Sequence, residues 1–192
     1  ITTKGFRDVL ELRRIRMPRL YDPLYVKPEP LVRREHRFEV NERIDGKGNV
    51  VTPVDLGDVI RIVEKIRESD IEAVAVTFLH SYLNGDHEKS VGEILRRELP
   101  QCFITLSIEI LPEIREYERT STTVINAYLG PPVKSYLKSL GKRLQGKGMN
   151  GRLMMMQSSG GMLDAETVQE KPAQIVECGP AAGVIGGAYL GQ

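Results

Sequence analysis

The amino-acid sequence predicts an α/β fold with a mainly parallel sheet and a β-hairpin excursion. Two observations carry this prediction. From Pro53 onward, stretches with helical apolar periodicity alternate with nearly continuous apolar stretches, which is the order of βαβ units. Residues 38–51, in contrast, alternate apolar and polar side chains around a glycine-containing turn, which is typical of a hairpin.

Residues 1–52 are expected to form a strand end, an extended connection and this hairpin. The connection is rich in proline, which cannot donate a backbone hydrogen bond: Pro18, Pro23, Pro28 and Pro30. The hairpin turn is predicted at Asp45–Asn49. Because residue 1 is Ile rather than Met, we expect the chain to be a piece of a longer polypeptide.

Residues 53–192 are expected to form the α/β part. A hydroxyl cap, a proline and an acid at Thr52–Asp55 predict a helix start, followed by apolar residues on one face through Ile66. The next expected elements are a buried strand, a helix closed by Pro100 and a further strand, at Ile71–Leu79, Asp86–Leu99 and Phe103–Ser107.

The second half of the chain continues the same alternation. A helix over Glu113–Leu129 is expected to break at Gly130–Pro132 and to be followed by a second amphipathic helix. Two strands at Leu153–Met156 and Ala173–Val176 and a last helix at residues 180–191 complete the prediction.

Composition narrows the function classes. The 27 Lys and Arg residues balance 26 Asp and Glu residues, so no net field favours nucleic acid or an anionic membrane surface. No apolar run approaches the roughly 20 residues of a membrane span. Two distant cysteines without metal-ligand spacing favour a reducing compartment, and we expect a cytoplasmic protein.

The glycine-rich end of the chain resembles a phosphate loop but lacks both common fingerprints, GK[ST] and GxGxxG. Its glycines recur every four residues at 179, 183, 187 and 191. In a helix this spacing places backbone without side chains along one stripe of the surface. Close helix packing is the favoured interpretation. An anion at the helix N-terminus is a possible second role.

Two polar segments are candidates for ligand contact. The loop Gln157–Gly161 follows an expected strand, where an α/β sheet usually meets its ligand, although a plain turn would have the same composition. The segment Arg115–Thr123 holds four consecutive hydroxyl residues, which are poor helix formers and favour a helix start that holds a ligand or crosses an interface. Surface pairing of Glu116 with Arg119, or of Arg115 with Glu118, is the alternative. The spacing of His80, Asp86 and His87, seven residues across a turn without a third strong ligand, does not predict a metal site.

Several segments in order along the chain resemble the family of hydantoinase A, 5-oxoprolinase and the acetone carboxylase β-subunit. They are Thr2–Glu11, Glu42–Asp45, Ala73–Val76, Leu79–Asn84, Glu116–Thr122, Asn126–Leu129, Met156–Gly161 and Gly179–Gly183.

The resemblance implies a partial ribonuclease H-like domain of the actin-like ATPase superfamily, with residues 180–191 as an inter-domain helix. It implies ATP and a divalent metal, expected to be Mg²⁺, in the full-length protein. The two phosphate loops of the family are absent from this sequence, so the chain alone is not expected to hydrolyse ATP.

For function, the resemblance implies an ATP-dependent amidohydrolase that opens a cyclic amide: hydantoin, N-methylhydantoin or 5-oxoproline. It also implies a hydantoinase B-type partner subunit or domain. The alternatives are the β-subunit of an ATP-dependent ketone carboxylase and, from another class, a non-catalytic scaffold that docks a partner subunit.

The candidate site residues follow from these segments. For the substrate they are Glu116, Arg119, Thr120 and Ser158; for the neighbourhood of ATP they are Gly160, Gly161, Gly179 and Gly183. No metal ligand is predicted.

Overall fold

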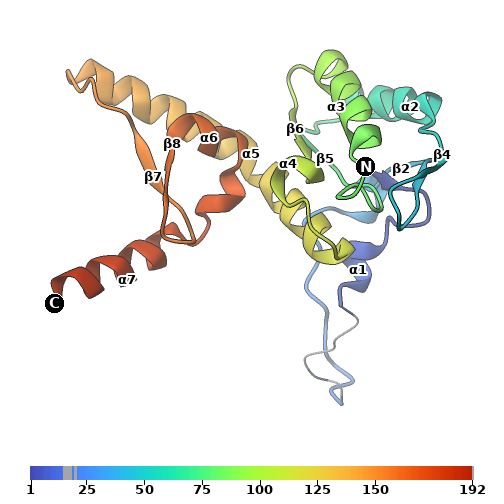
Figure 1. Ribbon diagram of the computed structural model, residues 1–192, viewed down its shortest axis with the longest axis horizontal. Helices are drawn as coiled ribbons and strands as arrows, with labels where there is room; N and C mark the ends of the chain where they lie inside the picture. The colour runs from blue at the N-terminus through green and yellow to red at the C-terminus, as the bar shows by residue number, and fades with distance from the viewer. Residues whose placement is uncertain (15–18, 20, 192) are drawn as a thin grey trace. The chain divides into compact units, whose positions relative to one another are not determined.

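A computed structural model describes residues 1–14, 19 and 21–191 of the chain (Figure 1). They divide into two compact units, Ile1–Ala127 and Tyr128–Gln192. Of the predicted extended connection, Pro18 lies outside the described residues.

Parallel strands form the centre of the first unit. β1 (Thr2–Thr3) pairs with β2 (Glu39–Val40), and β5 (Ala73–Val76) pairs with β6 (Phe103–Leu106), both in parallel. A parallel bridge between Thr2 and Thr77, with the Thr77 amide donating to the Ile1 carbonyl at 2.9 Å, joins the two pairs. The strand order is therefore β2-β1-β5-β6, and the predicted mainly parallel α/β architecture is confirmed for this unit.

Two amphipathic helices cover one face of these strands. α2 (Leu56–Arg67) contacts β2 and α3, and α3 (Asp86–Glu98) contacts β6 (Figure 1). Their apolar faces enclose a core that shares Val74 and Val76 of β5. Both helices were predicted, but the cap of α2 is Asp55, whose side chain accepts from two amides of the first turn, rather than Thr52.

The packing of α3 on β6 depends on a missing side chain. A Cβ on Gly92 would lie 2.7 Å from Cδ1 and 3.0 Å from Cδ2 of Leu106, which is itself 1% exposed. Glycine here allows helix and strand to approach closely.

The other face of the sheet meets α5 (Glu116–Gly146). Asn126 of α5 donates to the Thr105 hydroxyl of β6 at 3.2 Å, and both residues are buried. α5 does not break at residues 130–132, so that prediction was wrong. Pro131 and Pro132 remove two amide donors, but the φ angle fixed by the ring is compatible with helix, and the helix runs through them.

The remaining elements of the first unit are short: α1 (Val9–Leu12), the 3-10 turn η1 (Arg34–His36), β3 (Arg43–Ile44), β4 (Val50–Thr52) and α4 (Ser107–Ile110). β3 and β4 form the predicted antiparallel hairpin. The preceding residues Glu39–Val40 were expected in this hairpin but belong to the parallel sheet, because Val40 is fully buried there and the Lys4 amide donates to its carbonyl.

The second unit contains the antiparallel pair β7 (Met154–Met156) and β8 (Met162–Asp164), α6 (Ala165–Glu170), the 3-10 turn η2 (Pro172–Ile175) and α7 (Cys178–Leu190). β7 was predicted and β8 was not. The strand predicted at Ala173–Val176 was wrong: Pro172 begins a 3-10 turn, in which the Gln174 amide donates to the Lys171 carbonyl at 3.1 Å. A helix covers the stretch predicted at residues 180–191; that it joins two domains stays a prediction.

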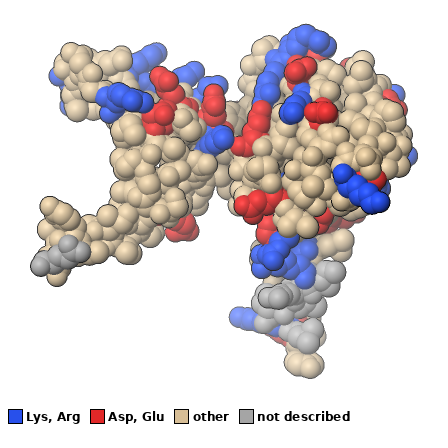
Figure 2. All heavy atoms as spheres, in the orientation of Figure 1, with Lys and Arg blue, Asp and Glu red and all other residues tan. Residues whose placement is uncertain are grey.

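Charged side chains of both signs are interspersed over the visible surface, whereas α7 is uncharged along its length (Figure 2). In the part of the chain that the structure describes, no helix has the length and apolar character needed to span a bilayer.

Candidate functional site

A hollow of about 810 Å³ lies in the first unit, beside the turn that follows β5. Three segments line it: residues 6–14 around α1, Leu79 and His80 after β5, and Arg115–Glu118 at the start of α5. Ligands of parallel α/β sheets bind beyond the carboxyl ends of the strands, and the Leu79–His80 wall lies just beyond such an end. This hollow is the candidate site.

Backbone strain is concentrated around the hollow. Among the described residues, the non-glycine positions with positive φ are Arg13 (55°), His80 (57°) and Arg115 (88°). All three line the hollow, and each belongs to a different segment of its wall. Strain of this kind persists only where surrounding contacts enforce it, and it clusters at ligand-binding and catalytic sites.

The wall of the hollow has an apolar part and a polar part. Its apolar side chains are Phe6, Val9, Leu12 and Leu79, and its charged side chains are Arg13, Arg14, Arg115, Glu116 and Glu118. Two of the arginines are already engaged. Arg14 Nε donates to Glu118 Oε1 at 2.5 Å, and Arg13 Nη2 donates to the Pro28 carbonyl at 2.6 Å.

A buried acidic side chain and a buried basic side chain hold the main chain of Phe78, just before the hollow. Glu88 Oε1 accepts from the Phe78 amide at 2.8 Å, and Arg119 Nη2 donates to the Phe78 carbonyl at 2.7 Å. Glu88 also accepts from the Ser107 hydroxyl at 2.7 Å and from the Ile108 amide at 3.1 Å, both beyond the end of β6. The Glu88 carboxylate thus joins the ends of β5 and β6.

Burial shifts the pKa of both side chains. Glu88 is 0% exposed, and burial raises the pKa of its carboxyl group against the effect of the amide and hydroxyl donors. Arg119 is 1% exposed, and burial lowers its pKa against the attraction of Glu88 and Glu116. Arg119 Cζ also lies 5.4 Å from the centre of the Tyr82 ring, while its Nε and Nη1 are enclosed without a hydrogen-bond partner among the described residues.

A second buried network holds the amide of Leu79. The Thr3 hydroxyl accepts from this amide at 2.8 Å and donates to Glu42 Oε1. The other oxygen of Glu42, Oε2, lies 2.8 Å from His87 Nδ1. Side chains from α3, α5 and β1 therefore fix the main chain at Phe78 and Leu79, and Glu42 supports the β1 side chain. These contacts restrict the turn that carries His80.

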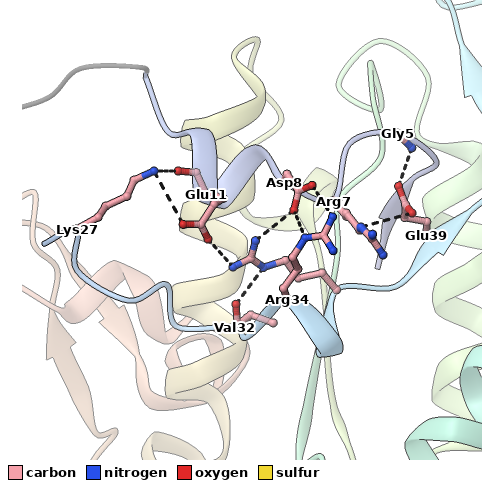
Figure 3. Close-up of polar contacts among 9 residues, drawn as sticks. Gly5, Arg7, Asp8, Glu11, Lys27, Val32, Arg34 and Glu39 are labelled. Carbon is pink, nitrogen blue, oxygen red and sulfur yellow. Dashed lines mark hydrogen bonds and ion pairs between the residues drawn. The ribbon is translucent and has the colours of Figure 1, made fainter.

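Ion pairs of the exposed Arg34 and the buried Arg37 hold the α1 wall (Figure 3). Arg34 donates to both oxygens of Asp8, at 2.9 and 3.0 Å. Arg37 donates to Glu11 at 3.1 Å and to the Val32 carbonyl at 3.0 Å. The hydrogen bond from Arg34 lowers the pKa of Asp8, which is exposed to solvent screening.

The structure brings two of the predicted substrate residues of the first unit, Glu116 and Arg119, close to the hollow. Glu116 lines it directly. Arg119, one turn further along α5, lies beneath its wall as described above, and Thr120 is half-buried on the same helix. The alternative of an exposed Glu116–Arg119 surface pair is wrong, because Arg119 is buried and bonds to the Phe78 carbonyl.

The predicted residues of the second unit lie at the start of α7 and in the loop beside it. The Ser158 hydroxyl donates to the Gln174 carbonyl at 2.9 Å and accepts from the Glu177 amide at 3.0 Å. Gly160 adopts φ 90°, and a Cβ there would lie 2.9 Å from Ile185 Cδ1.

The other glycines of the second unit differ in their surroundings. A Cβ on Gly161 would meet the Gln157 side chain at 2.5 Å. At Gly179 and Gly183 a Cβ would meet nothing within 4 Å. Close helix packing on this stripe, the favoured interpretation of the glycine spacing, is therefore not provided by the described part of the chain.

Comparisons with known proteins identify the family. Residues 1–99 match the family described as "Hydantoinase/oxoprolinase N-terminal region", and residues 119–192 match "Hydantoinase/oxoprolinase". The chain belongs to the hydantoinase/oxoprolinase family. The resemblance drawn from the sequence segments is thus confirmed.

Relatives in the hydantoinase/oxoprolinase family align over nearly all of the chain. An uncharacterized protein of Methanocaldococcus jannaschii is 50% identical over 192 residues, the caprolactamase subunit alpha of Pseudomonas jessenii is 31% identical over 194, and the 5-oxoprolinase of Saccharomyces cerevisiae is 30% identical over 213. The alignments cover 100%, 100% and 97% of this chain. They span 28%, 28% and 16% of the respective relatives.

Two solved structures of the family share the fold. The ATP-dependent caprolactamase from Pseudomonas jessenii has a TM-score of 0.88 at 32% identity, covering 94% of this chain and 26% of that one. A nucleotide-free acetone carboxylase has a TM-score of 0.86 at 25% identity, covering 99% and 28%.

Sequence reasoning missed the role of residues 6–14 and of His80 in the wall of the hollow. Thr2–Glu11 and Leu79–Asn84 were among the segments that carried the family resemblance, and this was the available signal. Apolar periodicity contains no information about a positive φ at His80, so neither the strain nor the convergence of the three segments could be read from it.

Proposed function

We propose that this chain contributes part of an ATP-dependent enzyme that opens a cyclic amide, such as hydantoin, N-methylhydantoin or 5-oxoproline. The observation that carries the proposal is the combined match of both hydantoinase/oxoprolinase regions with a TM-score of 0.88 to an ATP-dependent caprolactamase. The hollow supports it, because a small ring with an amide edge needs an apolar wall and a few polar groups.

Residues of this chain would act by binding and orientation. Glu116 lines the hollow and is the proposed substrate contact, and Arg119 is proposed to position the wall through the Phe78 carbonyl. Thr120 and Ser158 remain proposed substrate residues, although both hydrogen-bonding functions of the Ser158 hydroxyl are used inside the second unit.

ATP and a divalent metal, proposed to be Mg²⁺, would supply activation of the amide oxygen by phosphoryl transfer. The described residues do not fit the metal: no three side chains of His, Cys, Asp or Glu among them gather into a possible metal site.

Gly160, Gly161, Gly179 and Gly183 remain proposed neighbours of ATP. The Gly160 amide donates to the Gln157 carbonyl at 3.0 Å, and the Gly161 carbonyl accepts from the Gln157 amide at 2.7 Å. Gly179, in the first turn of α7, leaves open space beside its backbone. With so few donors and no metal-binding cluster among the described residues, we expect calorimetry to show no micromolar ATP binding by the chain alone. Tight Mg²⁺-dependent binding would contradict this map.

A ketone carboxylase is the second candidate. It is favoured by the acetone carboxylase structure and by the acetophenone carboxylase gamma subunit of Aromatoleum aromaticum, which is 35% identical over 85% of this chain and is covered over 23% of its own length. We also propose a partner subunit of the hydantoinase B type, supported by the subunit names of these relatives. A cytoplasmic location is proposed on the two free cysteines, Cys102 and Cys178.

The deciding experiment measures ADP release by the full-length protein, with its partner subunit, on addition of hydantoin, 5-oxoproline, caprolactam, or acetone with bicarbonate. Stimulation by a cyclic amide, with the ring-opened product detected, supports the proposal. Stimulation by acetone and bicarbonate alone would establish the carboxylase instead.

A further inference from the structure

His80 has an unusual position in the wall of the hollow. Its φ of 57° is in the left-handed region, which is unfavourable for a residue with a large side chain. Its Nδ1 atom is buried and has no hydrogen-bond partner among the described residues. A strained backbone that holds a buried ring nitrogen without a hydrogen bond is costly, so a contribution from a ligand is the simplest physical reason for the arrangement.

The turn that carries His80 cannot easily relax this strain. The two residues before it are fixed through Glu88, Arg119 and Thr3, all of which are buried. On its other side, the His80 ring meets the Tyr82 ring edge-to-face, with the centroids 6.1 Å apart. Since one group of contacts holds the main chain and another packs the ring, the imidazole is pre-organised before any ligand arrives.

The surroundings of His80 define the chemistry of a suitable ligand. Phe6, Val9 and Leu12 offer apolar contact from the α1 segment, while Arg115 and Glu116 place charged groups at the start of α5. A compact ring with apolar carbons on one side and hydrogen-bonding groups on the other matches this division. An imidazole is suited to the second side because it can donate or accept a hydrogen bond.

We propose that the hollow binds the cyclic amide itself and that His80 forms a hydrogen bond with its amide group. This inference rests on the proposed function and adds to it a second residue, besides Glu116, that contacts the substrate.

The three histidines of the chain provide an internal comparison. His36 is exposed in η1, His87 is bonded to Glu42, and neither lines the hollow. In the intact chain labelled with ¹⁵N-histidine, titration with 5-oxoproline, hydantoin and caprolactam should shift the His80 ring resonances saturably with at least one of these probes. His36 and His87 should stay in place. No shift with any probe, or equal shifts of all three rings, would overturn the inference.

The variant His80→Gly tests the contact directly, because glycine accepts a positive φ and should preserve the fold. Loss of the hydrogen bond should weaken probe binding about tenfold, without lowering the melting temperature. His36→Gly is the matched control and should bind as the unchanged chain does. Unaltered affinity in His80→Gly would refute the contact.

The inference and the proposed function fail in different ways. If the full-length enzyme cleaves ATP with a cyclic amide while His80→Gly leaves its KM unchanged, the function stands and the site is wrong. If the probes bind at His80 but no cyclic amide stimulates ADP release, the site stands and the proposed reaction is wrong.

Discussion

The two units of this chain differ in how far their polar and apolar groups are buried. In the first unit, Glu42, Glu88 and Arg119 are almost completely buried and bond to strand ends and to the turns beyond them. In the second unit, the loop around Ser158 is exposed, and α7 presents Val184, Tyr189 and Leu190 with exposed fractions of 74%, 80% and 86%. The first unit thus uses buried charged side chains to hold its strand ends, while the second leaves most of an apolar helix exposed.

This difference in burial determines where the loss of a polar group should cost stability. Buried hydrogen bonds can hold a turn in an unfavourable conformation, because breaking any of them leaves a donor or acceptor unsatisfied. An exposed loop has water as an alternative partner. Substitutions that remove the same kind of group should therefore have unequal effects in the two units.

The largest effect is expected from Glu88→Ala. Three donors, at Phe78, Ser107 and Ile108, lose their acceptor, at about 1–3 kcal/mol each when left unsatisfied, so the first unit should lose at least about 3 kcal/mol. Ser158→Ala should cost only about 1 kcal/mol, since its loop is exposed. Urea unfolding measures both, with Glu93→Ala on the exposed side of α3 as a neutral control. Equal losses in the free energy of unfolding for the two variants would contradict the difference between the two units.

The pH dependence of stability tests the role of Glu88. Because burial raises its folded-state pKa, the folded chain binds this proton more tightly than the unfolded chain does. The corresponding stabilisation is complete below the unfolded value of about 4.3 and is lost as the pH rises through the folded value. Unfolding measured across this window should show that decline in the original chain and not in Glu88→Ala; the same slope in both would contradict the assignment.

Two glycine substitutions in helices should have opposite signs. Gly92→Ala should destabilise by about 1–2 kcal/mol, because the new Cβ would be forced against Leu106. Gly183→Ala should stabilise by about 0.5–1 kcal/mol, since the site is open and alanine is the better helix former. Thermal unfolding compares them. A destabilising Gly183→Ala in the isolated chain would show that α7 is more closely packed than the structure indicates.

The strain at His80 is measured by a pair of variants that both remove the ring. His80→Ala retains the penalty of a positive φ, whereas His80→Gly does not, so the glycine variant should be more stable by about 1 kcal/mol. Denaturant midpoints give this difference. A difference near zero would mean that the backbone at this position relaxes.

The smallest effect is expected at Asp8, although its ion pairs are conspicuous (Figure 3). Asp8→Asn removes the pairing with Arg34, in which both side chains are exposed and screened by salt, and a longer pairing, at 3.7 Å, with the buried Arg37. Since Arg34 lowers the pKa of Asp8, its contribution is present above the unfolded value and is lost as the pH falls through the folded one. The original chain and Asp8→Asn should therefore converge in stability at low pH and in high salt; a gap that persists in 1 M salt would argue against simple pairing.

Much of the first unit could be predicted from its sequence, because periodicity and burial agree there. α2 and α3 follow from the spacing of apolar residues, and β5 and β6 from nearly continuous apolar stretches. The errors occur where local signals mislead: Pro131 and Pro132 suggested a break in α5, and the apolar stretch at Ala173–Val176 imitated a strand. β8 is too short to show a pattern.

The candidate site could be predicted only in part. Glu116 and Arg119 were identified because charged and hydroxyl residues are unusual in a helix that continues with apolar ones. The opposite wall depends on non-local contacts, such as that of Arg119 with Phe78, which is 41 residues away in sequence. No spacing rule connects such positions.

The bond between Arg119 and Phe78 also has a practical consequence for dividing the protein. Residue 119 is the first position of the second family match, whereas Phe78 lies within the first match, and both belong to the compact unit that ends at Ala127. A truncation between the two matches, at residue 99, would remove β6, the donors to Glu88 that follow it, and the Arg119 donor to the Phe78 carbonyl. A shortened chain that keeps the hollow should therefore end beyond residue 127, within α5. Neither boundary of the family matches marks this position.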